Sequence, residues 1–115
     1  MGDGDIKADA GFGSTTSVYL PRAWIHYNHT TDVLAGSGGV SSVSDDSTGQ
    51  ITVNFTTNMP DNNYVVMGTA SNSTTFTNNT VVPSNLTNGS VQVQIKNADT
   101  GVLADRENVM IAFLR

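Results

Sequence analysis

Cysteine is absent from this sequence of 115 residues, which excludes a disulfide framework and thiolate chemistry. Good helix formers are scarce, with Glu107 the only glutamate and Lys7 and Lys96 the only lysines. Only 37% of the residues are hydrophobic, and no apolar run approaches the roughly 18 residues of a membrane span. Because Asn, Ser, Thr and Gly dominate instead, the composition predicts an all-β fold with no membrane partner.

Positive charge is also scarce. The formal net charge is −5, and the three arginines, Arg22, Arg106 and Arg115, form no cluster that could neutralise a run of phosphates. We therefore expect no nucleic-acid partner. The first ten residues, MGDGDIKADA, lack the basic and apolar regions of a secretory signal, which predicts a soluble protein made in the cytoplasm.

No combination of residues predicts catalysis, a cofactor or a metal site. His26 and His29 have H-x-x-H spacing, but residues three apart on a strand point to opposite faces and could share a metal ion only across a turn. Asp45 and Asp46 are explained by a turn, and the acidic residues 2–9 lack the glycine and glutamate of a calcium loop. Nucleophile and phosphate-loop motifs are absent, so we expect a non-enzymatic protein. A carbohydrate-active enzyme, which needs two carboxylates brought together by folding, stays a third possibility.

Alternating apolar residues predict the strands. Ile51, Val53 and Phe55 alternate with polar residues, which is typical of a half-buried strand. The turn residues 60–63 and the apolar run 64–67 then predict a hairpin over 50–70. Residues 30–39 are predicted to be loop, and 71–90 to be short strands or a surface excursion. Other strands are predicted at 23–28, near 40–43, at 91–95 and at 109–114.

About seven or eight short strands with regular turns predict an antiparallel β-sandwich or a small jelly-roll-like barrel, which we place at residues 22–115. Residues 1–21 have no sustained period and are predicted to form an extended N-terminal arm. The residues expected in the core are Trp24, Val53, Phe55, Tyr64 and Val93. The arm residues expected to anchor the chain to a neighbouring surface are Ile6, Phe12, Val18 and Tyr19.

Two predicted strands, YVVM at 64–67 and VMIAFL at 109–114, are apolar on both faces. A sandwich of this size normally leaves one face of each strand in water, and exposed apolar side chains forgo ~1.5 to 3 kcal/mol each. Self-association would cover them. The residues that we expect at such an oligomer interface are Met67, Val109, Ile111 and Phe113.

Short motifs occur in a recognisable order: RAWIHYN at 22–28, VSSV at 40–43 followed by ITVNF at 51–55, and MPDNNY at 59–64. In this order they resemble a β domain of tailed-phage virion proteins, which typically reads R-A-W-[VI]-x-[FY]-N, V-S-S-[IV], T-V-N-F and M-P-D-x-N-Y. The resemblance spans about residues 22–70. It implies a structural protein of tail-fibre or head-decoration type on the virion surface, made in the host bacterial cytoplasm and assembled as a homotrimer.

Members of this family often carry the domain after a fibrous shaft, whereas only an arm of some twenty residues precedes Arg22 here. This departure favours a capsid decoration or cement protein whose partners are copies of itself and the major capsid protein or another virion protein. The alternative is the receptor-binding tip of a tail fibre, in which the loops near 71–90 contact a host cell-surface glycan.

Overall fold

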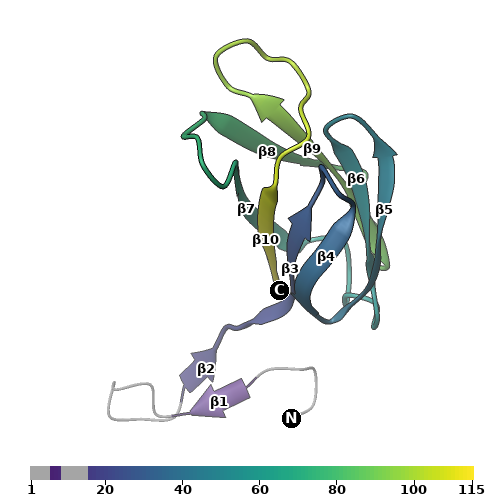
Figure 1. Cartoon of the computed structure of the whole chain (residues 1–115). Helices are drawn as coiled ribbons and strands as arrows, with labels where there is room; N and C mark the ends of the chain where they lie inside the picture. Colours follow the sequence, from purple (N-terminus) through teal and green to yellow (C-terminus); the bar gives the residue numbers. More distant parts are fainter. Residues whose placement is uncertain (1–5, 9–15) are drawn as a thin grey trace.

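The computed structural model describes residues 6–8 and 16–115, and these residues form ten β-strands (Figure 1). Among them there is no helix long and apolar enough to cross a membrane. The strands are β1 (Ile6–Ala8), β2 (Thr16–Val18), β3 (Pro21–Asn28), β4 (Val33–Gly38), β5 (Val40–Ser47), β6 (Gln50–Phe55), β7 (Val65–Ser71), β8 (Asn79–Ser84), β9 (Ser90–Asn97) and β10 (Asn108–Leu114).

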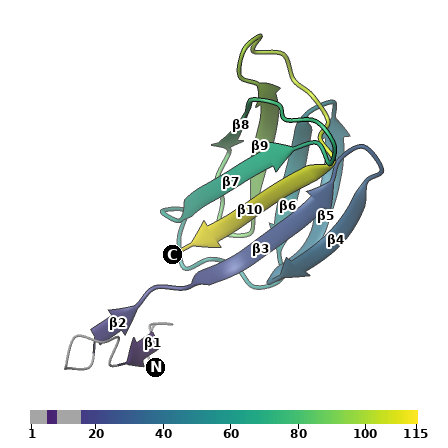
Figure 2. The ribbon, with the colours of Figure 1, turned by 60° about the vertical axis from the view of Figure 1, so that its left-hand side comes forward.

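Two four-stranded antiparallel sheets pack face to face, which confirms the predicted antiparallel β-sandwich. One sheet has the order β4-β3-β10-β7 and the other β5-β6-β9-β8. The short strands β1 and β2 pair antiparallel with each other, and both Figure 1 and Figure 2 show this pair standing clear of the sandwich. Each long strand turns one face inward, so the core lies between the sheets.

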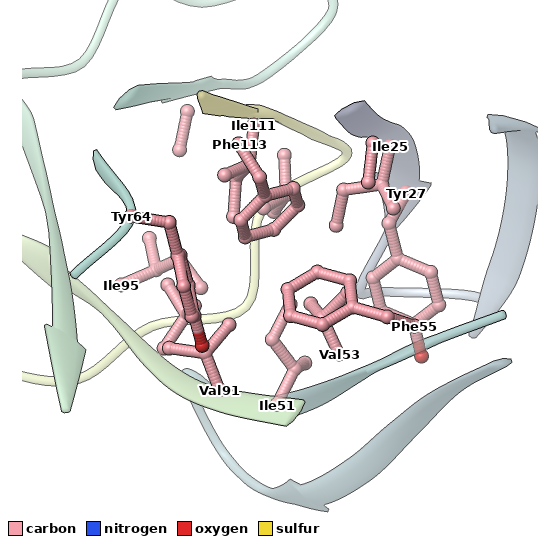
Figure 3. Close-up of a cluster of buried hydrophobic side chains, with 14 of the residues drawn as sticks. Ile25, Tyr27, Ile51, Val53, Phe55, Tyr64, Val91, Ile95, Ile111 and Phe113 are labelled. Carbon is pink, nitrogen blue, oxygen red and sulfur yellow. The ribbon is translucent and has the colours of Figure 1, made fainter. Parts of the chain in front are cut away.

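Aromatic rings join the two sheets at the centre of the core (Figure 3). Phe55 of β6 meets Phe113 of β10 edge to face, with ring centroids 5.1 Å apart, and meets Tyr64 in the same way at 5.5 Å. The Tyr64 hydroxyl lies within hydrogen-bonding distance of two backbone carbonyls, those of Thr87 and Ser90. The burial of Val53, Phe55, Tyr64 and Val93 confirms four of the five predicted core residues.

Trp24, the fifth predicted core residue, is 46% exposed, so that prediction was wrong. In β3 the inward positions belong to Ala23, Ile25 and Tyr27, which are almost fully buried. Alternation along the strand therefore turns Trp24 outward. There its ring covers Gly36 and Gly38 of β4.

The predicted hairpin over residues 50–70 was also wrong. β6 pairs with β5 and β9, whereas β7 is an edge strand of the other sheet and pairs with β10. Residues 56–64 cross between the sheets, and the buried Met59 and Tyr64 pack this crossing against the core. Turn residues predict that the chain changes direction, but not which strand it pairs with next.

One strand, β4, lies where the sequence predicts loop, and β8 is one of the short strands that it predicts as one of two alternatives for residues 71–90. β4 contains the glycines 36 and 38, which have low strand propensity, and the Trp24 ring above them supplies the packing that they lack. β8 contains Pro83 and lies at the edge of its sheet, where a missing ladder donor is tolerated. In both segments, the position in the folded sheet allows a strand to form despite residues of low strand propensity.

Candidate assembly surface

The last strand, β10, lies in the middle of its sheet and turns alternate residues to opposite sides. Val109, Ile111 and Phe113 face the core, with exposures of 0%, 3% and 0%, so these three residues are not available to a partner. The expectation that they form an oligomer interface was wrong by one position in register. The outward residues of this strand are Met110, Ala112 and Leu114.

Met67 is the one residue of the expected interface that lies at the surface, where it is 46% exposed. It belongs to a continuous outward set on β3, β10 and β7, the strands that Figure 2 shows side by side at the front of the molecule. We call this set the outer apolar face. Its residues are Trp24, Val65, Met67, Met110, Ala112 and Leu114.

The outer apolar face is hollow at its centre because of one small residue. Ala112 lies opposite Trp24 on one side and opposite Met67 on the other, so a methyl group separates two large side chains. The resulting open hollow has a volume of about 530 Å³, and Met110 also lines it. Methionine side chains adapt readily to the shape of a partner, so this hollow can receive an apolar group.

Polar side chains border the outer apolar face near the C-terminal end of β3. His26 Nε2 lies 3.0 Å from Asn108 Oδ1, and the Asn108 amide Nδ2 donates to Ser71 Oγ at 3.4 Å. His26 therefore lies on the outer side of the sheet, whereas His29 is buried beyond the strand end. As the spacing predicts, the two histidines do not point to a common site.

At the opposite end, the chain terminus is held by an ion pair. The Arg115 guanidinium donates to Asp61 through Nε at 2.9 Å and through Nη2 at 2.7 Å. These bonds, together with the Asn63 backbone N–H, hold the pKa of the Asp61 carboxyl at about 2. Arg22 Nε donates to the Arg115 carbonyl oxygen at 3.1 Å, which fixes β3 against the end of β10.

The second sheet presents the opposite chemistry to solvent. Its outward residues on β6 are Gln50, Thr52 and Asn54, and those on the neighbouring β9 include Gln92 and Gln94. These amide and hydroxyl side chains need no partner to be solvated. The sandwich therefore has one polar and one apolar outer face, and the apolar one is the candidate assembly surface.

The structure describes only some of the anchoring residues expected in the arm. Ile6 of β1 lies opposite Val18 of β2 in the antiparallel pair. Tyr19 is 69% exposed just before the sandwich begins. Phe12 lies outside the described residues.

Sequence reasoning missed most of the outer apolar face. Trp24 was assigned to the core, and Val65, Met110, Ala112 and Leu114 were not singled out. The signal that could have found them is the strand period, because residues two apart in 109–114 must share a face. No family model, curated protein sequence or solved structure matches the chain.

Proposed function

We propose that this chain is a non-enzymatic structural protein of a tailed-phage virion, a capsid decoration or cement protein that assembles as a homotrimer through its outer apolar face. The observation that carries the proposal is the apolar character of that face, which contrasts with the amide-rich outer face of the other sheet. The sequence resemblance over residues 22–70 supports the virion context.

The energetic argument rests on contiguous exposed side chains. Trp24, Met67 and Val65 are each about half exposed, and Met110 is 37% exposed beside them. Burying a large apolar side chain is worth ~1.5 to 3 kcal/mol, so a partner that covered the face would gain several times this amount before the entropic cost of association. A second copy offers a matching apolar face, and repeated packing around one axis gives a closed assembly.

Attachment to the capsid falls to the N-terminal part of the chain, which we propose as residues 1–21. The β1–β2 pair lies outside the sandwich in both views (Figures 1 and 2), and the exposed Tyr19 and Leu20 join it to β3. This position leaves the outer apolar face free for self-association. The arm can therefore contact the major capsid protein while the sandwiches contact one another.

Imaging of intact virions tests this function. The proposal predicts a copy number that matches the capsid symmetry and density at the head surface. A chain with residues 1–17 deleted should keep its β fold by circular dichroism and lose attachment. A handful of copies at the tail tip, or full head occupancy by the truncated chain, would contradict the proposal.

The alternative is the receptor-binding tip of a tail fibre, and one observation favours it. A hollow of about 290 Å³ on the polar outer face is lined by Gln50, Gln92 and Gln94 together with Pro83. Amide groups of this kind are suitable partners for sugar hydroxyls. Binding of the purified protein to host cells, lost in Gln92→Ala and retained in Met67→Ala, would favour this alternative over decoration.

A further inference from the structure

His29 is the one polar residue fully buried among the residues that the structure describes, and both of its ring nitrogens face carboxylates. Nε2 lies 2.8 Å from Asp45 Oδ1, and Nδ1 lies 3.2 Å from Asp105 Oδ1. Only the first of these contacts has hydrogen-bond geometry, and Nδ1 has no hydrogen-bond partner although it is buried. A buried nitrogen without a bond is costly, so the ring needs an explanation.

A neutral imidazole cannot satisfy both contacts. With the proton on Nδ1, the lone pair of Nε2 points at an Asp45 oxygen 2.8 Å away; with the proton on Nε2, the unprotonated Nδ1 lies 3.2 Å from an Asp105 oxygen. Either tautomer sets a lone pair against an anion. The ring nitrogen that carries no proton therefore requires a positive partner between it and the carboxylate, which is either a second proton or a metal ion.

A third carboxylate decides between these two. Asp32 lies in the turn between β3 and β4, and its carboxylate oxygen, an Asp45 oxygen and a His29 ring nitrogen all lie within 4.8 Å of one another. With Asp105, three carboxylates surround one imidazole, so even a doubly protonated ring leaves two negative charges uncompensated. A divalent cation bound to the neutral ring would leave one negative charge, fewer than the two that remain beside a doubly protonated ring.

The groups that would hold such an ion are themselves held from behind. The Tyr27 hydroxyl donates to Asp32 Oδ1 at 3.0 Å, and the Gly49 N–H donates to Asp105 Oδ1 at 2.7 Å. The Asp105 carboxylate lies 3.2 Å from the far ring nitrogen, and a donor behind a carboxylate ligand is a support that metal ligands usually have.

We propose that His29 Nε2, Asp45 and Asp32 form a binding site for a divalent transition-metal ion, with Asp105 as the residue that orients the imidazole. One nitrogen and two carboxylate oxygens suit Zn²⁺ or a neighbouring first-row ion, whereas Ca²⁺ prefers six or more oxygens. Asp32 and Asp45 are exposed, so water can complete the coordination. The site lies apart from the outer apolar face and does not depend on the proposed function.

Bound metal would join the β3–β4 turn to β5, and the imidazole that it holds faces Asp105 in the loop before β10. The unfolded chain does not hold these segments together, so binding should stabilise the fold. This gives a readout that does not require knowledge of the biological role.

Calorimetric titration of the chelator-treated full chain with ZnCl₂ tests the proposal. We expect one Zn²⁺ per chain and a rise in melting temperature with Zn²⁺ concentration. Co²⁺ should give the visible absorption of a site with bound nitrogen and oxygen ligands. Asp32→Asn and Asp45→Asn should each weaken Zn²⁺ binding at least tenfold, and Asp105→Asn by about 10- to 100-fold.

Asp46→Asn is the matched control, because it removes the same charge at the neighbouring position. The Asp46 carboxylate does not face His29 and accepts a hydrogen bond from the Thr52 hydroxyl. It should leave Zn²⁺ affinity unchanged. Asp32 is exposed, so its variant should stay folded, and circular dichroism checks this. No Zn²⁺ binding by the folded wild-type chain, or equal binding by Asp32→Asn and Asp46→Asn, would overturn the proposal.

Discussion

The Trp24 indole covers Gly38 of the neighbouring strand so closely that a Cβ atom on that glycine would lie 2.5 Å from Trp24 Nε1. The far edge of the same ring covers Gly36, 3.1 Å from the position of its missing Cβ. The indole thus fills the space that two side chains would occupy on the edge strand β4. Its place on the outer apolar face depends on both glycines.

Gly38→Ala should displace the Trp24 ring, since a methyl group cannot fit beneath it. Overpacking of this kind costs ~1 to 3 kcal/mol of stability. Trp24 is the only tryptophan, so its fluorescence reports the displacement directly. Ser37→Ala, on the intervening and exposed residue, is the control. An emission spectrum and a denaturation midpoint equal to those of the control would show that the ring does not rest on this glycine.

Phe55→Ala should remove the ring that joins the two sheets. Because Phe55 is 7% exposed and contacts both Phe113 and Tyr64, we expect a loss of ~3 to 5 kcal/mol, which is enough to unfold a small domain. Urea denaturation measures the change. Thr56→Ala, at the next and exposed position, should shift the midpoint little, and equal effects of the two changes would refute this core assignment.

The Asp61–Arg115 pair should appear in the pH dependence of the protein. Folding lowers the pKa of the Asp61 carboxyl from 3.8 to about 2, so the pair stabilises the fold above pH 3.8 and this stabilisation is lost as the pH falls toward 2. Arg115→Ala should raise this pKa only part of the way to 3.8, because the Asn63 N–H still donates to the carboxylate. Titration of the carboxyl carbon by NMR measures it. An unchanged pKa in the variant would show that Arg115 does not contact Asp61 in solution.

Strands whose alternation was complete could be predicted from the sequence. Ile51, Val53 and Phe55 alternate with polar residues, and the structure buries all three. The predicted burial of Trp24 was wrong because it rested on hydrophobicity alone. Neighbouring residues of a strand face opposite sides, and Ile25 takes the buried side. Where both faces of a strand are apolar, as in 109–114, the alternation of residues does not show which face points into the core. The packing of the strand in its sheet determines this.

Pairing between distant segments could not be predicted. The strands 50–55 and 65–71 are neighbours in the sequence but belong to different sheets. The carboxylates around His29 have the same origin, since the fold brings together Asp32 of the β3–β4 turn, Asp45 of β5 and Asp105 of the loop before β10. The H-x-x-H spacing relates His29 only to His26, whereas Asp45 and Asp105, which lie against its ring nitrogens, are distant in the sequence.

Met67→Asp should dissociate the assembly, since it sets an unpaired charge at the rim of the central hollow. Thr80→Asp places the same charge on the exposed outer side of β8, also an edge strand, and should have no effect on assembly. Both variants should keep the β-sheet circular dichroism of the wild type. Dissociation by both changes would argue against the outer apolar face as the interface.

The molar mass of the wild-type chain in solution tests the central claim most directly. Light scattering coupled to gel filtration, at micromolar concentration, should give three times the mass of one chain, and Met67→Asp should give the mass of a single chain under the same conditions. A wild-type protein that runs as a monomer at this concentration would contradict assembly through the outer apolar face.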